Sequence, residues 1–66
     1  MEIGDYIRHK RKIFNLSQVE LAECAGVGIR FVRELENGKQ TVQLNKVNQV
    51  LDLFGETLRP AKIDNE

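Results

Sequence analysis

The 66-residue sequence predicts a compact all-α domain of four short helices, followed by a short C-terminal β-strand. Two observations lead to this prediction. Apolar residues recur at helical spacing in four separate segments, and each segment is followed by asparagine or glycine, which tolerate the left-handed conformation that ends many helices. After the last of these glycines, Gly55, the pattern alternates and contains the single proline. We therefore divide the chain into a helical domain, residues 1–55, and a C-terminal element, residues 56–66.

The first helix is expected over residues 3–14. Ile3, Ile7 and Phe14 recur there at helical spacing, and Asn15 follows. The basic residues between them keep one face of this helix in solvent, where they either support phosphate neutralisation or only increase solubility. These residues are Arg8, Lys10 and Lys12.

Two further helices, over residues 18–25 and 28–37, are expected to follow with a tight turn between them. Ser17 can cap the first of the two, because Glu20 lies three residues later and can reach back to the Ser17 amide. Gly26 interrupts the apolar period and tolerates the backbone conformation that a sharp turn between helices requires.

The second helix of this pair leaves an outer face made of Ile29, Arg30, Arg33 and Glu34. Two arginines one turn apart on a short exposed helix favour contact with phosphate or guanine. The alternative is a solvated face with a local Arg30–Glu34 pair at i, i+4. Glu34 either accepts a hydrogen bond from a cytosine amino group or holds an arginine in place, and we favour the second role.

A fourth helix is marked by an apolar stripe comprising Leu44, Val47, Val50, Leu51 and Phe54. The segment after Gly55 is either an edge strand or a disordered tail, since its proline cannot donate to a sheet. An unpaired strand is unstable, so we expect it to pair with its copy in a second subunit. The expected dimer contacts are Val50, Phe54, Leu58 and Arg59.

The composition restricts the classes of function. Residues 8–39 hold seven Lys or Arg and four Glu, so a basic centre can face nucleic acid although the net charge is zero. The single Cys24, expected to be a half-buried packing residue, excludes an intrachain disulfide, and no Cys/His cluster offers a zinc site. These features and the lack of a signal peptide fit the reducing cytoplasm, with nucleoid association on DNA.

Neither catalysis nor membrane insertion is expected. The sequence has no nucleophile–base pair, paired carboxylates, phosphate loop or metal cluster, so we expect no catalytic residue, metal or cofactor. Its apolar runs are too short to span a membrane.

Three segments in combination resemble the phage-repressor-type (Cro, XRE) helix-turn-helix family, whose fold is the lambda-repressor-like DNA-binding domain. They are residues 16–22 (LSQVELA), 25–27 (AGV) and 34–39 (ELENGK). More narrowly, residues 35–42 running into Leu44, and a strand-like segment after only four helices, are similar to HipB-like antitoxins. The resemblance covers residues 3–58.

The resemblance implies roles for individual residues. Gln18 matches a residue that contacts the DNA backbone or the neighbouring base. Residues 28–33 match the front of the recognition helix, whose outward residues read base edges. Gly28 departs from the Ser or Thr that the family often has there, and glycine caps a helix without a side-chain hydrogen bond. Phosphate contacts are implied for Asn37, Lys39 and the amides beside Gly38.

A salt bridge between Arg11 and Glu36 is implied as well, tying the first helix to the end of the recognition helix.

We expect a sequence-specific transcriptional repressor that acts as a homodimer on an inverted-repeat DNA operator, with recognition helices about 34 Å apart. The narrower resemblance implies an antitoxin that represses its own operon and binds a HipA-like kinase toxin. The alternatives are a free-standing phage-type repressor and a helical protein-interaction module that does not bind DNA.

Overall fold

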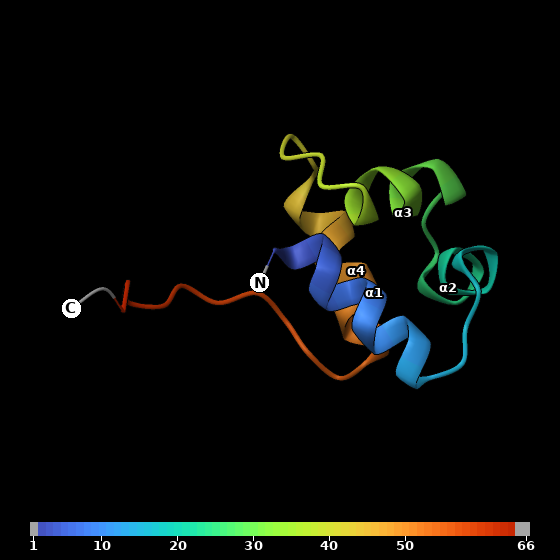
Figure 1. Cartoon of the computed structure of the whole chain (residues 1–66), viewed down its shortest axis with the longest axis horizontal. Coiled ribbons are helices and arrows are strands. Elements are labelled where there is room, and N and C mark those ends of the chain that lie inside the picture. The colour runs from blue at the N-terminus through green and yellow to red at the C-terminus, as the bar shows by residue number, and fades with distance from the viewer. Residues whose placement is uncertain (1, 65–66) are drawn as a thin grey trace.

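Four helices form the folded part of the computed structural model, which describes residues 2–64. They are α1 (Ile3–Ile13), α2 (Gln18–Ala25), α3 (Ile29–Glu36) and α4 (Leu44–Leu53). Helix α2 packs on α3 and α4, and α1 packs on α3; Figure 1 shows α1 in front of α4, with α3 and α2 beside them. The prediction of four helices is confirmed, and the ends of the first three differ from those expected by at most one residue.

Local signals fix the start of α2 and the turn between α2 and α3. The amide of Glu20 donates to Ser17 Oγ at 3.0 Å, and the amide of Ser17 donates to Glu20 Oε1 at 2.8 Å, so the expected capping box is present. Gly26 ends α2 with a φ of 75°, a conformation that favours glycine. The N-cap of α3 is then Gly28, which has no side chain to accept a hydrogen bond.

The inward faces of the four helices meet in one apolar core. It consists of Ile7, Leu21, Ala22, Val32, Leu35, Val47, Val50 and Leu51. The assignment of Val50 to a dimer surface is wrong, because its side chain is 0% exposed. Val47, Val50 and Leu51 lie at i, i+3 and i+4, so they share the inward stripe of α4. Cys24 is exposed rather than half-buried, since it lies outside the inward face of α2.

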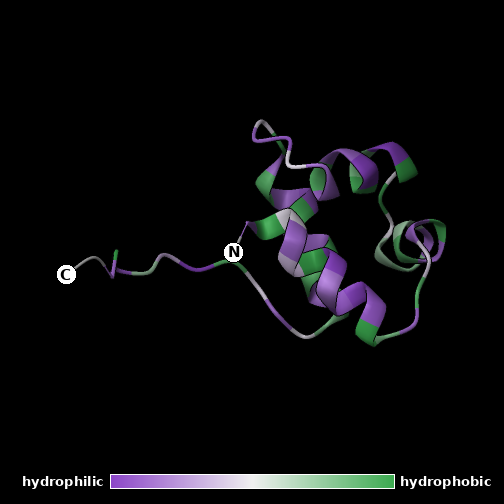
Figure 2. Cartoon of the chain, in the orientation of Figure 1, coloured by the Kyte–Doolittle hydropathy of each residue, from purple (hydrophilic) through white to green (hydrophobic). Residues whose placement is uncertain are grey.

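Helix α1 lies unusually close to the end of α3. A Cβ atom added to Gly4 would collide with the backbone carbonyl of Leu35. Glycine at this position therefore allows backbone to pack against backbone, which sets the distance between the two helices. Most of the α1 ribbon has the colour of hydrophilic residues (Figure 2).

The C-terminal element forms no strand, and none occurs anywhere in residues 2–64. This differs from the predicted strand for a physical reason: the helical chain offers no second strand to pair with. Residues 56–64 instead lead past the start of α1 and away from the helices (Figure 1). Residues 65 and 66, which complete the predicted element, lie outside the described part of the chain.

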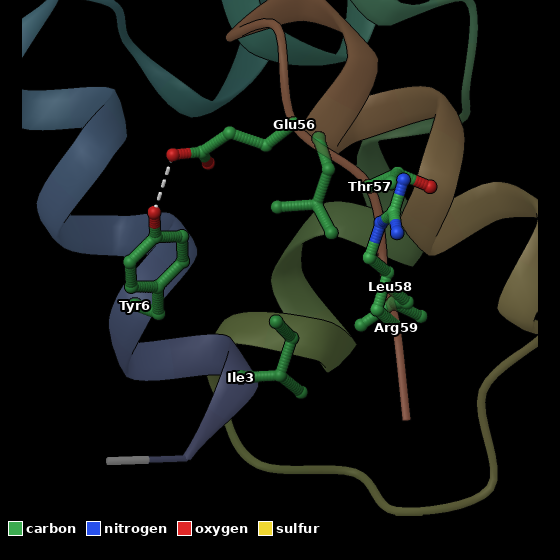
Figure 3. Close-up of a pocket in the computed structure, with 7 residues that line it drawn as sticks. Ile3, Tyr6, Glu56, Thr57, Leu58 and Arg59 are labelled. Atoms are coloured by element: carbon green, nitrogen blue, oxygen red, sulfur yellow. Dashed lines mark hydrogen bonds between the residues drawn. The ribbon is translucent and has the colours of Figure 1, made fainter. Parts of the chain in front are cut away.

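The beginning of this tail is nevertheless attached to the helices. Tyr6 Oη donates to Glu56 Oε2 at 2.6 Å (Figure 3), and Lys10 Nζ lies 3.3 Å from the same oxygen. The amide of Leu58 donates to Asn48 Oδ1 at 2.9 Å. An open cleft of ≈ 450 Å³ remains between α1 and the tail, and it is lined by Ile3, Tyr6, Leu51 and residues 56–59.

Candidate nucleic-acid interface

The outer face of α3 carries its charged residues. Arg30 and Arg33 are exposed, and the side chain of Arg30 is 90% accessible to solvent. Val32 and Leu35 occupy the opposite side of the helix and are buried in the core. Ile29, which was expected on the outer face, is half-buried and packs against that core. The surface that α3 offers to a partner is therefore polar and rich in cations.

Glu34 lies between two of the cations on this surface. Arg30 Nε approaches Glu34 Oε2 at 3.3 Å, and Lys39 Nζ approaches Glu34 Oε1 at 3.3 Å. The hydrogen bond from Lys39 lowers the pKa of Glu34 most; burial opposes it, and Arg30 adds to the lowering. The i, i+4 pair considered from the sequence is thus present, and the carboxylate holds Lys39 as well.

Arg33 differs from Arg30 in its surroundings. Within residues 2–64 no salt bridge involves Arg33, and its side chain is exposed. A guanidinium in this state has its whole planar set of donors available, which suits bidentate binding of phosphate or of a guanine edge.

The inner side of the end of α3 is held by a buried carboxylate. Glu36 is 4% exposed. Arg11 binds it through two hydrogen bonds, Nε to Oε2 at 2.8 Å and Nη2 to Oε1 at 3.0 Å. Arg11 Nη1 also donates to the carbonyl oxygen of Leu16 at 2.9 Å. The two residues that the resemblance paired are therefore brought together, and they join α1, the α1–α2 connection and α3.

Two further donors complete this cluster. Gln18 Nε2 donates to Glu36 Oε1 at 3.0 Å, and Arg8 Nε donates to the same oxygen at 3.3 Å. Burial raises the pKa of Glu36, but the hydrogen bonds from Arg11, Gln18 and Arg8, together with the charge of Arg11, outweigh it and leave the pKa below its usual value. The carboxylate is ionised near neutral pH and fixes three helices around it.

The cluster also shows what sequence reasoning missed. The resemblance implies a DNA contact for Gln18, and it gave no indication that the amide nitrogen of this residue donates to Glu36 Oε1. Arg8 was treated as a surface cation, although it binds both the side chain and the backbone oxygen of Glu36. A signal for Arg8 did exist, because it lies three residues before Arg11 on the same face of α1.

The loop after α3 was expected to bind phosphate through Asn37, Lys39 and the amides beside Gly38. Both side chains are exposed. The amides, however, are already engaged: those of Asn37, Gly38 and Lys39 donate to carbonyl oxygens of Arg33, Leu35 and Glu34 at 3.0–3.1 Å. The last carbonyls of a helix need such donors, so the backbone here ends α3 rather than facing a ligand.

The remaining residues of the predicted dimer surface lie near α1 and the tail. Leu58 and Arg59 line the cleft shown in Figure 3. The Phe54 ring packs against that of Phe14, with 4.9 Å between the ring centroids. In the described residues 2–64, no group of three or more His, Cys, Asp or Glu could hold a metal ion, and no helix is long and apolar enough to cross a membrane.

Two short helices joined by a glycine turn, with the second exposing arginines, define the class of this fold. The chain belongs to the helix-turn-helix family, whose sequence model matches residues 7–60. An uncharacterized HTH-type transcriptional regulator of Sinorhizobium fredii, y4mF, is 54% identical to it over 54 residues. That alignment covers 82% of this chain and 71% of the relative.

Proposed function

We propose that this protein regulates transcription by binding double-stranded DNA through α3. The observation that carries the proposal is the exposed cationic face of α3, with Arg33 unpaired within residues 2–64 and the helix held in position by the Glu36 cluster. The similarity to an HTH-type transcriptional regulator supports it independently. Arg33 is the main candidate for reading a base, whereas Lys39 and Asn37 are candidates for phosphate contacts.

The proposed active form is a homodimer that represses its own promoter at an inverted repeat. A chain of 66 residues buries only about 60% of its unfolded surface, so association adds stability that a monomer lacks. Phe54, Leu58 and Arg59 are the proposed contacts, with the tail of residues 56–64 lying against the same segment of a second copy. Leu58 is 37% and Ile63 83% exposed, which leaves apolar surface available to such a partner.

A narrower role is proposed from the resemblance to HipB-like antitoxins, which rests on residues 35–42 and the short tail. In this role the protein also binds a HipA-like kinase toxin and regulates the operon that encodes both. A kinase-like reading frame directly beside the gene, and co-purification of its product with this chain, would support the antitoxin role. A gene without such a neighbour would instead favour a free-standing repressor.

DNA binding is tested with a mobility shift on the protein's own promoter at low and at high salt. Phosphate contacts dominate such affinities, so the shift should weaken steeply as salt rises. Replacing Arg33 by lysine keeps the charge but removes the planar fork. Arg33→Lys should therefore lose selectivity if Arg33 reads a guanine, and retain it if Arg33 binds phosphate. No shift of the unmodified protein at low salt would contradict DNA binding and favour a protein-interaction module.

The dimer is tested separately by sedimentation. A chain lacking residues 56–66 should sediment as a monomer at concentrations where the full chain is dimeric. Because this deletion also removes the Glu56 and Leu58 attachments to the helices, helical content is compared by circular dichroism in parallel. The substitution Leu58→Asp gives a second variant with the tail still present. Unchanged association in both variants would exclude the tail from the interface.

A further inference from the structure

Glu34 is an unusual residue for a surface that contacts DNA. It points out from the same face of α3 as Arg30, and its carboxylate would meet the phosphates of a bound duplex. Its side chain is 33% exposed, whereas those of Arg30 and Lys39 are 90% and 45% exposed. The carboxylate thus lies beneath two more accessible cations, one preceding it by a helical turn and one in the loop after α3.

We propose that Glu34 is a specificity-determining residue, which withholds Arg30 and Lys39 from indiscriminate phosphate binding and so increases the preference of the protein for its operator. This inference rests on the proposed DNA-binding function and assigns a role within that interface. Each oxygen of the carboxylate is occupied by a different cation at 3.3 Å. One residue therefore controls two of the positive charges on the α3 surface.

The physical basis is the difference between phosphate and base recognition. Binding to arbitrary DNA depends almost entirely on the number of phosphates that cations neutralise. Cations paired with Glu34 contribute less to that number, and the carboxylate itself repels the DNA backbone. Every base pair presents one amino donor in the major groove, on cytosine or on adenine, but the position of that donor depends on the base pair and its orientation. A sequence that places this donor opposite Glu34 avoids part of the penalty, and other sequences bind less well.

The surroundings of Glu34 support the same role. A groove of ≈ 310 Å³ runs beside α3, and its lining consists of Gly28, Arg30, Phe31, Glu34, Gln43 and Lys46. Glu34 is the acidic member of this set, and Lys46 of α4 has its Nζ 5.9 Å from the centroid of the Phe31 ring. Because Lys39 and Arg30 hold the pKa of Glu34 below its usual value, the carboxylate that an approaching duplex meets is charged near neutral pH.

The test compares Glu34→Gln with a matched control. Asp52→Asn also removes one exposed acidic charge, but from the last turn of α4, which takes no part in the groove beside α3. The operator probe is the duplex that the unmodified protein enriches from a random-sequence pool, and the second probe is the same duplex with its bases scrambled. Affinity for both is measured by fluorescence anisotropy at about 50 mM and about 200 mM salt.

We expect Glu34→Gln to bind scrambled DNA about three- to fivefold more tightly than Asp52→Asn does, since one ion-pair partner is lost. The slope of log affinity against log salt should steepen by about 0.9 for each cation released. Operator affinity should change less, so the ratio of operator to scrambled affinity falls. Equal tightening on both probes would overturn the inference, as would weaker operator binding with scrambled binding unchanged. Failure of the unmodified protein to enrich any duplex would contradict the proposed function itself.

Discussion

Replacing Arg11 by methionine is the most informative perturbation of the scaffold beneath the proposed interface. Methionine retains an unbranched, mostly aliphatic side chain but removes the guanidinium. Glu36 would then lose both hydrogen bonds from Arg11, including its shortest at 2.8 Å, and the carbonyl of Leu16 would lose its donor from Arg11. The side chain of Glu36 is 0% exposed, so water cannot replace these partners without local rearrangement.

The size of the expected loss of stability follows from the burial of Glu36. Removing one partner of a buried ion pair costs about 3–5 kcal/mol, because the other charge is left uncompensated. Gln18 and Arg8 still donate to Glu36 in the variant, which places the cost near the lower end of that range. A core of this size rarely supplies more than about 3–5 kcal/mol of stability. The free energy of unfolding of the Arg11→Met variant should therefore be only a small fraction of that of the unmodified protein.

Urea unfolding followed by far-ultraviolet circular dichroism measures this loss, and Arg8→Met is the matched control. The Arg8 side chain is 41% exposed and 3.3 Å from Glu36, so its removal should cost about 1 kcal/mol or less. Adding Glu36→Leu to Arg11→Met removes the orphaned charge and should recover stability. Similar small losses from both arginine variants would refute the reasoning, as would no recovery in the double variant.

Three other predictions concern the scaffold. Gly4→Ala should destabilise the fold by about 1–3 kcal/mol, because the added Cβ would force α1 away from α3. Gly28→Ala is the control and should cost less in the same denaturation assay, since no atom lies within 4 Å of the added Cβ. Equal losses from the two variants would contradict this explanation. Ser17→Ala should cost about 1 kcal/mol by removing the N-cap of α2, and an unchanged melting temperature would exclude that contribution. The pKa of Glu36 is depressed in the folded state, so the ionised carboxylate stabilises the fold at neutral pH, and this contribution to the free energy of unfolding is lost as the pH falls below about 4.5. Glu36→Gln should flatten the decline of stability with falling pH. An identical decline in the variant would show that Glu36 does not cause it.

The helices could be predicted because their signals are local. The Ser17–Glu20 capping box and the left-handed Gly26 act across three or four residues, and both occur where the sequence places them. The Arg11–Glu36 pair was reached only through a family resemblance, since these residues lie 25 positions apart on different helices. The burial of Val50 was within reach, because it shares the apolar spacing of Val47 and Leu51.

The sequence by itself determined which segments are helical, where they end, and that arginines lie on the outside of α3. It did so because hydrogen bonding within a helix and the 3.6-residue period depend on neighbours in the chain. Only the tertiary structure decided that Gln18 and Arg8 bind Glu36. These contacts depend on how closely the helices pack, and Gly4 allows α1 to lie directly against the backbone of α3 because it has no Cβ atom.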